Sequence, residues 1–303
     1  MDYILETENL TKMYGKKAAL NNVSIHVNQG DIYGLVGRNG AGKTTFMKIV
    51  CGLAQKTKGN YYIFGRCDDA LGDVAQRRGL LIESPGFFQE YSAEMNLKIK
   101  LKLMGINDPE EPKRLLKLIG LEDTGKKKAK NFSLGMKQRL GIGIALAGNP
   151  DLVVLDEPIN GLDPQGIIEI RDMIGKLNRE NGTTFIISSH ILDELSKIAT
   201  KYGIINNGEL IEESPAEELR NKCESRVELV TDNAAKAMGV LERLGFSKMK
   251  VLDDGKINIY EQFDRTGDIT LSLAAEGITT YEIVRKLESI ENYYLRLVGK
   301  ESE

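Results

Sequence analysis

The stretch that decides the fold is Gly37-Arg38-Asn39-Gly40-Ala41-Gly42-Lys43-Thr44. It follows a short apolar run over residues 32–36, which is typical of a buried parallel strand. After it, the segment from Thr44 to Leu53 predicts a helix. Backbone N–H groups in a glycine-rich turn form a concave anion site, and the positive N-terminal end of the next helix strengthens it. The sequence therefore predicts a phosphate-binding loop between a strand and a helix.

The side chains of this loop predict a nucleoside triphosphate and Mg²⁺ as ligands. Lys43 is placed to reach the β- and γ-phosphates, which makes it a candidate catalytic residue, and the Thr44 hydroxyl is a candidate Mg²⁺ ligand. A chance match in a glycine-rich turn is the alternative, and the flanking strand and helix argue against it. The predicted nucleotide-binding residues of the loop are Gly37, Arg38, Asn39, Gly40, Ala41, Gly42, Lys43, Thr44 and Thr45.

Two adjacent carboxylates follow a second apolar run, Leu152-Val153-Val154-Leu155. A buried strand would deliver Asp156 and Glu157 to one edge of a sheet. Asp156 is the candidate Mg²⁺ ligand, directly or through water. Glu157 is the candidate general base that orients or deprotonates the attacking water. A strand that ends in solvated acids is the alternative, and the phosphate loop upstream argues against it.

The 303 residues include 41 basic and 44 acidic side chains, which gives a net charge of −3. This near balance gives no support for a nucleic-acid binder that acts through bulk charge. Three scattered cysteines match no metal or redox spacing and favour a reducing compartment. We find no signal peptide, and no run of about 18 apolar residues, the length that a membrane-spanning helix needs. We therefore expect an intracellular globular protein.

The pattern of apolar residues changes along the chain. Alternation at Val23, Ile25 and Val27 predicts one half-buried strand. Helical spacing then prevails over residues 84–150, before strand character returns at 152–155 and 184–187. The expected helices of this insertion cover residues 91–104, 111–119 and 133–147.

Beyond about Pro215 the predicted order of elements is βαββαβ, the split-βαβ arrangement. The expected strands cover residues 226–230, 248–252, 256–260 and 279–284, the expected helices 233–244 and 268–276, and a last helix 286–297. The sequence thus predicts two domains, 1–215 and 216–303, the second being a small α+β accessory domain.

A third motif, Phe132-Ser133-Leu134-Gly135-Met136-Lys137-Gln138-Arg139, opens an expected helix. Ser133 is a good N-cap, so a simple helix start is one interpretation. A serine hydroxyl and the Gly135 N–H at a helix N-terminus also suit a γ-phosphate.

The order of these motifs resembles the nucleotide-binding subunit of ABC transporters, from about Ile4 to about Glu213. The family signature, commonly Leu-Ser-Gly-Gly-Gln, stands here as Phe-Ser-Leu-Gly-Met at 132–136. Residues 160–163 match the D-loop, which ends in Asp163, and His190 matches the switch histidine. Tyr14 has the place of an aromatic residue that stacks on adenine, so the resemblance implies ATP.

The resemblance also implies an α/β fold. We expect a P-loop NTPase core with an N-terminal antiparallel β-subdomain and an inserted helical subdomain at about 84–150, followed by the α+β C-terminal domain.

Two departures from the family pattern indicate a subgroup. Glu83 stands where the family usually has glutamine, in the wording Leu-Ile-Glu-Ser-Pro at 81–85. The signature replaces a glycine with Leu134 and a glutamine with Met136. Both features resemble the subgroup that serves bacitracin-type and lantibiotic-immunity exporters. Glu83 adds negative charge near Mg²⁺, which makes it a candidate metal and nucleotide ligand in this chain.

The mechanism that the resemblance implies needs two chains. Two copies would face head to tail, so that each ATP contacts one chain's phosphate loop and the other chain's Ser133 and Gly135. His190 would contact the γ-phosphate and Asp163 would link the two sites. Glu157 and His190 are accordingly the candidate catalytic residues beside Lys43.

Three functions remain open at this point. The first is an ATPase that energises an exporter, for antimicrobial peptide export or immunity, attached to the inner face of the cell membrane. Its expected partners are a second nucleotide-binding subunit, as a homodimer, and separate integral membrane permease chains, with no nucleic acid. The second is a soluble ABC ATPase in cofactor assembly or another role outside transport. The third is a regulatory subunit with little turnover, against which the intact Lys43, Asp156, Glu157 and His190 argue.

Overall fold

The computed structural model describes residues 3–67, 74–189, 192–223, 225–286 and 288–299. The chain forms two compact units, Met1–Ala216 and Glu217–Glu303. The assignment of functional domains at 1–215 and 216–303 stays a prediction. None of the helices in the described ranges combines the length and the apolar character that crossing a lipid bilayer demands.

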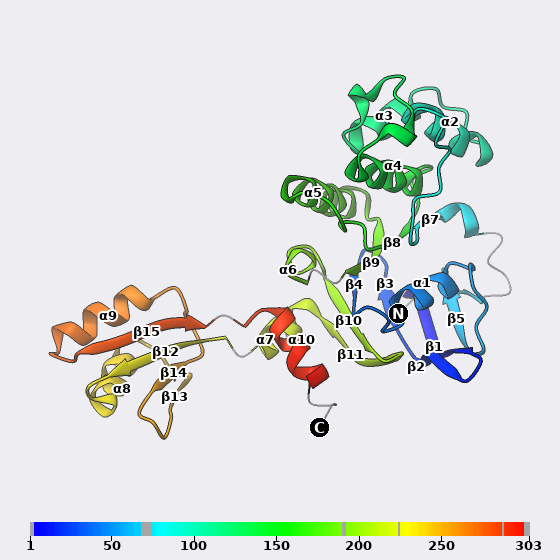
Figure 1. Cartoon of the computed structure of the whole chain (residues 1–303). Coiled ribbons are helices and arrows are strands. Elements are labelled where there is room, and N and C mark those ends of the chain that lie inside the picture. Colours follow the sequence, from blue (N-terminus) through cyan, green and yellow to red (C-terminus); the bar gives the residue numbers. More distant parts are fainter. Residues whose placement is uncertain (1–2, 68–73, 190–191, 224, 287, 300–303) are drawn as a thin grey trace. The chain divides into compact units, whose positions relative to one another are not determined.

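The first unit is built on a six-stranded sheet with the order β11-β10-β4-β9-β8-β7 (Figure 1). Its strands are β4 (Ile32–Val36), β7 (Arg78–Leu81), β8 (Leu152–Asp156), β9 (Thr184–Ser189), β10 (Lys201–Asn206) and β11 (Glu209–Pro215). All neighbours pair in parallel except β10 and β11. Every residue of β4, β8 and β9 is buried, which explains why these strands are continuous apolar runs without alternation.

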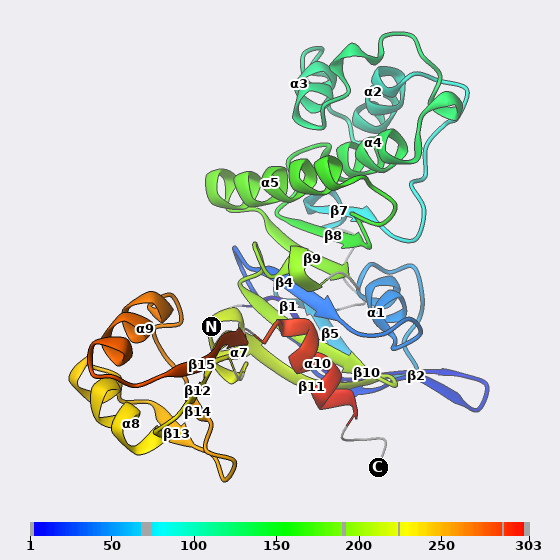
Figure 2. The same ribbon diagram turned by 60° about the vertical axis from the view of Figure 1, so that its left-hand side comes forward.

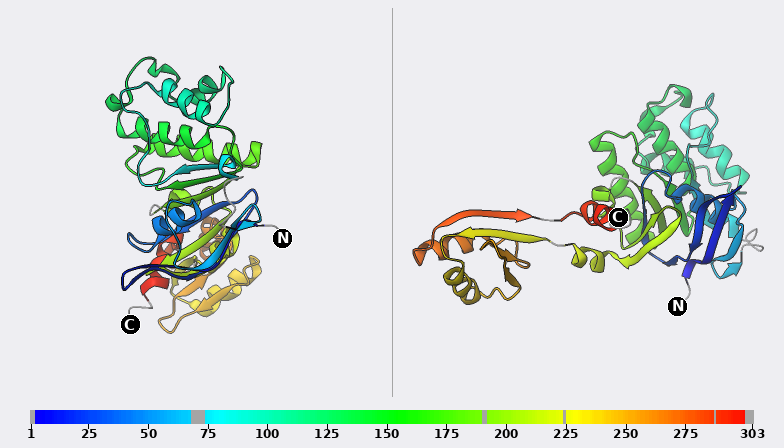
Figure 3. Two further views of the ribbon diagram at one scale, coloured as in Figure 1. Left: turned by 90° about the vertical axis from the view of Figure 1, so that its right-hand side faces the viewer. Right: turned by 60° about the horizontal axis from the view of Figure 1, so that its bottom comes forward.

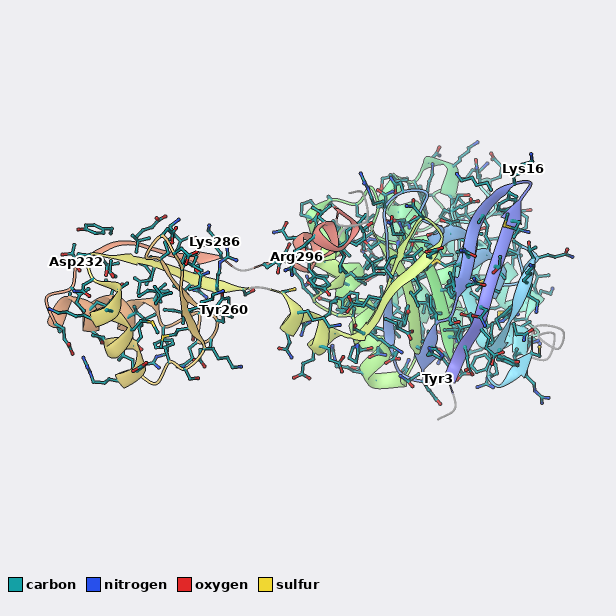
Figure 4. The ribbon with its side chains drawn as sticks, turned by 90° about the horizontal axis from the view of Figure 1, so that it is seen from below. Tyr3, Lys16, Asp232, Tyr260, Lys286 and Arg296 are labelled. Carbon is teal, nitrogen blue, oxygen red and sulfur yellow. The ribbon has the colours of Figure 1, made fainter. Side chains whose placement is uncertain are left out.

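A second, antiparallel sheet in this unit contains β1 (Tyr3–Tyr14), β2 (Lys17–Val23), β3 (His26–Asn28), β5 (Lys58–Ile63) and β6 (Arg66–Cys67). Figure 4 shows Tyr3 at one end of β1 and Lys16 at the turn into β2. The single strand predicted at Val23, Ile25 and Val27 was wrong, although the three side chains are buried as expected. The chain breaks into β2 and β3 there, because Thr7 of β1 pairs with the main chain of Ile25 through both its backbone N–H and its hydroxyl.

The predicted helical insertion is present and forms a group of helices at one end of the first unit (Figures 1 and 2). It contains α2 (Ala93–Leu103), α3 (Glu111–Leu118), the short 3₁₀ turns η2 (Glu122–Thr124) and η3 (Ala129–Asn131), and α4 (Leu134–Leu146). Ser92 and Ser133 cap α2 and α4 by accepting the N–H of the residue three positions later. The remaining helices of this unit are α1 (Lys43–Val50), α5 (Pro164–Asn181), α6 (Leu192–Leu195) and the start of α7 (Ala216–Lys222).

The main core of the first unit lies around α1 and the two sheets. Phe46 and Met47 of α1 are fully buried with Leu10 of β1, Leu35 of β4 and Ile186 of β9. This packing fixes the end of α1 that carries the glycine loop.

The second unit has the predicted βαββαβ order, with β12 (Arg226–Thr231), α8 (Ala234–Arg243), β13 (Met249–Val251), β14 (Ile257–Ile259), α9 (Thr266–Ala275) and β15 (Thr280–Lys286). The sheet order is β13-β14-β12-β15, and all pairs are antiparallel. Asp232 and Lys286 mark opposite ends of the β12–β15 pair (Figure 4). Helices α8 and α9 cover one face of this sheet (Figure 3), and their apolar residues form a core separate from that of the first unit.

The last predicted helix begins later than expected. Lys286 still belongs to β15, where it pairs with Arg226, and α10 covers Ile290–Gly299. Apart from this start and the break at Ser24–Ile25, the predicted α/β fold class with its antiparallel, helical and α+β parts is confirmed.

Candidate functional site

The glycine loop opens onto a cavity of about 480 Å³. Three segments that are distant in sequence surround it: the loop with the start of α1, the ends of β1 and β2 that are joined by their turn, and the turn between β10 and β11. Glu157, after β8, joins them. The lining residues are Tyr14, Lys17, Ala18, Ala19, Arg38, Asn39, Gly40, Gly42, Lys43, Thr44, Thr45, Glu157, Asn207 and Gly208.

Two glycines of the loop are required by its geometry. Gly42 is the residue before α1 and has φ +114°, and a Cβ there would lie 2.7 Å from the carbonyl oxygen of Ala19. Gly37 has no positive φ, but a Cβ would lie 2.4 Å from the carbonyl oxygen of Ile205. The backbone therefore approaches two other segments too closely for any side chain. No side chain caps the N-terminus of α1, so its first N–H groups can serve an anion in the cavity.

Lys43 lies at the bottom of this loop and is buried. Its Nζ donates a hydrogen bond to the carbonyl oxygen of Gly37 at 2.6 Å and lies 3.7 Å from Oε1 of Glu157. The ammonium group thus stands between the loop and the carboxylate that the sequence identified as the candidate base. An arrangement of this kind places a fixed positive charge where phosphate would enter.

The two candidate Mg²⁺ ligands of the sequence, Thr44 and Asp156, are in direct contact. The Thr44 hydroxyl donates to Oδ2 of Asp156 at 2.9 Å, and the Ser188 hydroxyl donates to Oδ1 at 2.5 Å. One hydroxyl and one carboxylate suit Mg²⁺, which completes its six oxygen ligands with phosphate and water. No group of three or more His, Cys, Asp or Glu side chains within the described ranges could hold a metal alone. The donor set therefore fits a metal that arrives with a nucleotide.

Glu157 has a left-handed backbone, with φ +50°. Its N–H donates to both the hydroxyl and the carbonyl oxygen of Ser188, at 2.9 and 3.2 Å. Its carbonyl oxygen accepts from Asn160 N at 3.1 Å and from Nε2 of Gln138 at 3.3 Å. Such a conformation is uncommon for a residue with a Cβ, and it persists here because four contacts fix it. The strained turn aims the Glu157 side chain into the cavity.

Tyr14 lies at the open side of the cavity, and its side chain is 54% exposed. The ammonium group of Lys12 lies 4.8 Å from the centroid of its ring. A ring with a free face suits stacking on a planar base. Cys51, just after α1, is buried, and burial raises its pKa to about 12, so it is no nucleophile at neutral pH.

Several predicted site residues do not line the cavity. The Glu83 carboxylate forms an ion pair with Nζ of Lys48 at 2.5 Å. Gly37 and Ala41 belong to the glycine loop, but they are not among the described residues that line the cavity. Ser133 and Asp163 serve as N-caps of α4 and α5, with Gly135 in the first turn of α4. His190 lies outside the described residues. The role of Glu83 as a metal ligand stays a prediction, as do the roles of Ser133, Gly135, Asp163 and His190.

The sequence reasoning missed five lining residues: Lys17, Ala18, Ala19, Asn207 and Gly208. Asn207-Gly208 is a dipeptide typical of tight hairpin turns, and it does connect β10 to β11. Its place beside the loop depends on Gly208, whose N–H donates to Ala41 and whose carbonyl accepts from Asn21. Such long-range contacts leave no local signal.

Comparisons with known proteins agree with this geometry. Residues 20–160 match the ABC transporter family model. The bacitracin transport ATP-binding protein BcrA of Enterococcus faecalis is 40% identical over 99% of this chain and 97% of its own length. The lantibiotic transport ATP-binding protein SrtF of Streptococcus pyogenes is 44% identical over 69% of this chain and 89% of its own length.

Solved structures resemble the first unit. A dimeric ATP-binding cassette in a post-hydrolysis state, bound to ADP and Pi, has a TM-score of 0.65 and 26% identity, and covers 70% of this chain and 98% of its own. The recognised family and subgroup are therefore confirmed, and the chain belongs to the ABC transporter family as an ATP-hydrolysing, ATP-binding protein.

Proposed function

We propose that this chain is the ATPase of an exporter for peptide antibiotics, and that it works as a homodimer on separate permease chains at the inner face of the cell membrane. The observation that supports this most is the similarity to BcrA, which extends over 99% of this chain and so includes the second unit. The role outside transport is not favoured, because the named relatives are transport proteins.

The residues at the cavity have separate roles in ATP binding and hydrolysis. Tyr14 offers a stacking face to adenine, and the loop N–H groups with Lys43 bind and orient the phosphates. Thr44 and Asp156 would hold Mg²⁺, which supplies charge neutralisation at the phosphates. Glu157 accepts the proton of the attacking water at its carboxylate. Lys43 Nζ lies 3.7 Å from that carboxylate and so holds it next to the loop that would bind the phosphates.

A head-to-tail dimer accounts for the predicted residues outside the cavity. Ser133 and Gly135 lie at the N-terminus of α4, which suits an anion from another chain, and Asp163 lies at the start of α5. Related cassettes of this fold have been solved as dimers. We infer that these residues complete the site of the partner copy.

An exposed aromatic cluster supports contact with a permease. Phe88, Tyr91 and Met95 are each about half exposed, and the rings of Phe88 and Tyr91 lie 5.9 Å apart. The buried Asn96 fixes this segment by bonding both the N–H and the carbonyl oxygen of Phe88. A rigid apolar patch just after Glu83 suits a docking helix of a membrane partner.

The test compares wild type with Glu157→Gln, which keeps the shape of the side chain and removes the base. We expect unchanged ATP binding and a loss of turnover of at least a hundredfold. In cells that also express the permease chains of the transporter, the variant should fail to confer resistance to the exported peptide. Turnover of Glu157→Gln at the wild-type rate would refute the role of the base, and resistance independent of this chain would refute the exporter.

A further inference from the structure

The start of α4 contacts the segment after β8 through two leucine–glycine pairs. A Cβ added to Gly161 would lie 2.5 Å from Cδ2 of Leu134, and a Cβ added to Gly135 would lie 3.2 Å from Cδ2 of Leu162. Each leucine therefore lies directly over a glycine of the other segment. We call these four residues the leucine–glycine interlock. A larger residue at Gly161 would displace the Leu134 side chain and would be strained by the backbone φ of +74°.

The same helix contacts Glu157 one turn further on. Gln138 follows Leu134 by four residues, so both side chains lie on one face of α4. Nε2 of Gln138 donates to the carbonyl oxygen of Glu157 at 3.3 Å. The helix thus holds the stretch 157–162 near both ends, with Gln138 at Glu157 and Leu134 at Gly161.

Leu134 cannot be explained as a core residue, because it is 60% exposed. In the family pattern this position is commonly glycine, which has no side chain to lie on Gly161. Single exposed leucines are common on protein surfaces, so exposure alone assigns no role to Leu134. Its contact with Gly161 is the feature of the described structure that favours a leucine here.

We propose that Leu134 and Gln138 are positioning residues for Glu157, and that they link the two ATP sites of a dimer. This rests on the proposed head-to-tail arrangement, in which Ser133 and Gly135 contact the nucleotide of the partner copy. A shift of the α4 start toward that nucleotide is transmitted by Leu134 to Gly161 and by Gln138 to the Glu157 backbone. The carboxylate of Glu157, which acts on the nucleotide of its own chain, then reaches its catalytic position.

The experiment uses the full chain with Leu134→Ala, Leu134→Met and Gln138→Ala. Leu103→Ala, at an 80% exposed leucine that ends α2, is the matched control. The first readout is hydrogen exchange of the amides in 157–163 without nucleotide, which needs no catalysis. The second is ATP turnover, measured as kcat, KM and the Hill coefficient for ATP.

We expect Leu134→Ala and Gln138→Ala to speed exchange in 157–163 severalfold, and to lower kcat about tenfold with KM changed less than about twofold. The Hill coefficient should fall toward one, Leu134→Met should restore it, and Leu103→Ala should match wild type. Unchanged exchange, or slower turnover with the wild-type Hill coefficient, overturns the proposal. If the wild type does not hydrolyse ATP cooperatively, the proposed link between the two ATP sites and the proposed dimer are both overturned. The hydrogen-exchange result alone decides whether Leu134 and Gln138 hold the Glu157 segment.

Discussion

Ser188 gives the sharpest test of how the two acids are held. The hydroxyl of this fully buried residue donates to Oδ1 of Asp156 at 2.5 Å and accepts the N–H of Glu157 at 2.9 Å. In Ser188→Ala the Asp156 oxygen loses a donor, whereas the Glu157 N–H keeps the carbonyl oxygen of residue 188 at 3.2 Å. One hydrogen bond to a charged group is therefore lost outright, which costs about 1.5–3 kcal/mol.

For a unit of this size, about 2 kcal/mol corresponds to a fall in Tm of roughly 4–8 °C. Calorimetry measures it, and the transition of the first unit is the one that ATP raises. The loosened turn at Glu157 should also lower kcat by about tenfold or more, while the Kd for ATP changes less than about twofold, because Lys43 and its loop are untouched. Ser196→Ala, at a hydroxyl that donates to the Asp193 carbonyl on α6, is the control. A Ser188→Ala protein with wild-type Tm and kcat would refute this reasoning.

Three further outcomes follow from single contacts. Gly42→Ala should abolish ATP binding in equilibrium dialysis, because the new side chain would sit at φ +114° and against a carbonyl oxygen. The control Gly52→Ala, also at positive φ but in open space, should bind ATP normally. Thr44→Val should raise the Mg²⁺ concentration for half-maximal turnover at least tenfold in a titration with saturating ATP. The hydrogen bond from Lys197 lowers the pKa of Glu194 below 4.5, so its stabilisation is present above that pH and is lost as the pH falls through the lowered value. Thermal melts of Glu194→Gln and wild type should therefore differ at pH 7 and converge once the pH falls below the lowered pKa of Glu194.

The sequence predicted those parts of the site that depend on local chemistry. The glycine loop and the pair Asp156–Glu157 could be identified because backbone geometry and metal binding demand these residue types next to a strand. Ala19 of β2 and Asn207 of the β10–β11 turn could not, since their place at the cavity depends on the pairing of β1 with β2 and of β10 with β11. Ser188 was not among the predicted site residues, although in the structure its hydroxyl contacts both Asp156 and the backbone of Glu157.

The fold shows the same division. Continuous apolar runs predicted β4, β8 and β9, because parallel strands covered on both faces need them. Alternation correctly indicated which side chains near Val23 are buried, yet it could not reveal that Thr7 interrupts the strand. Alternation of apolar and polar residues indicates which side of a strand each side chain faces, but it does not indicate which strand pairs with which.

The convergence of distant motifs is a consequence of parallel pairing. In β4, β9 and β8 the register places Val36 beside Ser189 and Asp156 beside Ser188. Parallel neighbours have their carboxyl ends at the same edge, so residues after Val36 and after Asp156 meet there although more than a hundred positions separate them. The acids reach the loop as a result of strand register, and Ser188 fixes their final orientation. Changes that shift this register should therefore impair magnesium binding and hydrolysis together, whereas the changes at Leu134 and Gln138 of α4 should lower hydrolysis without impairing magnesium binding.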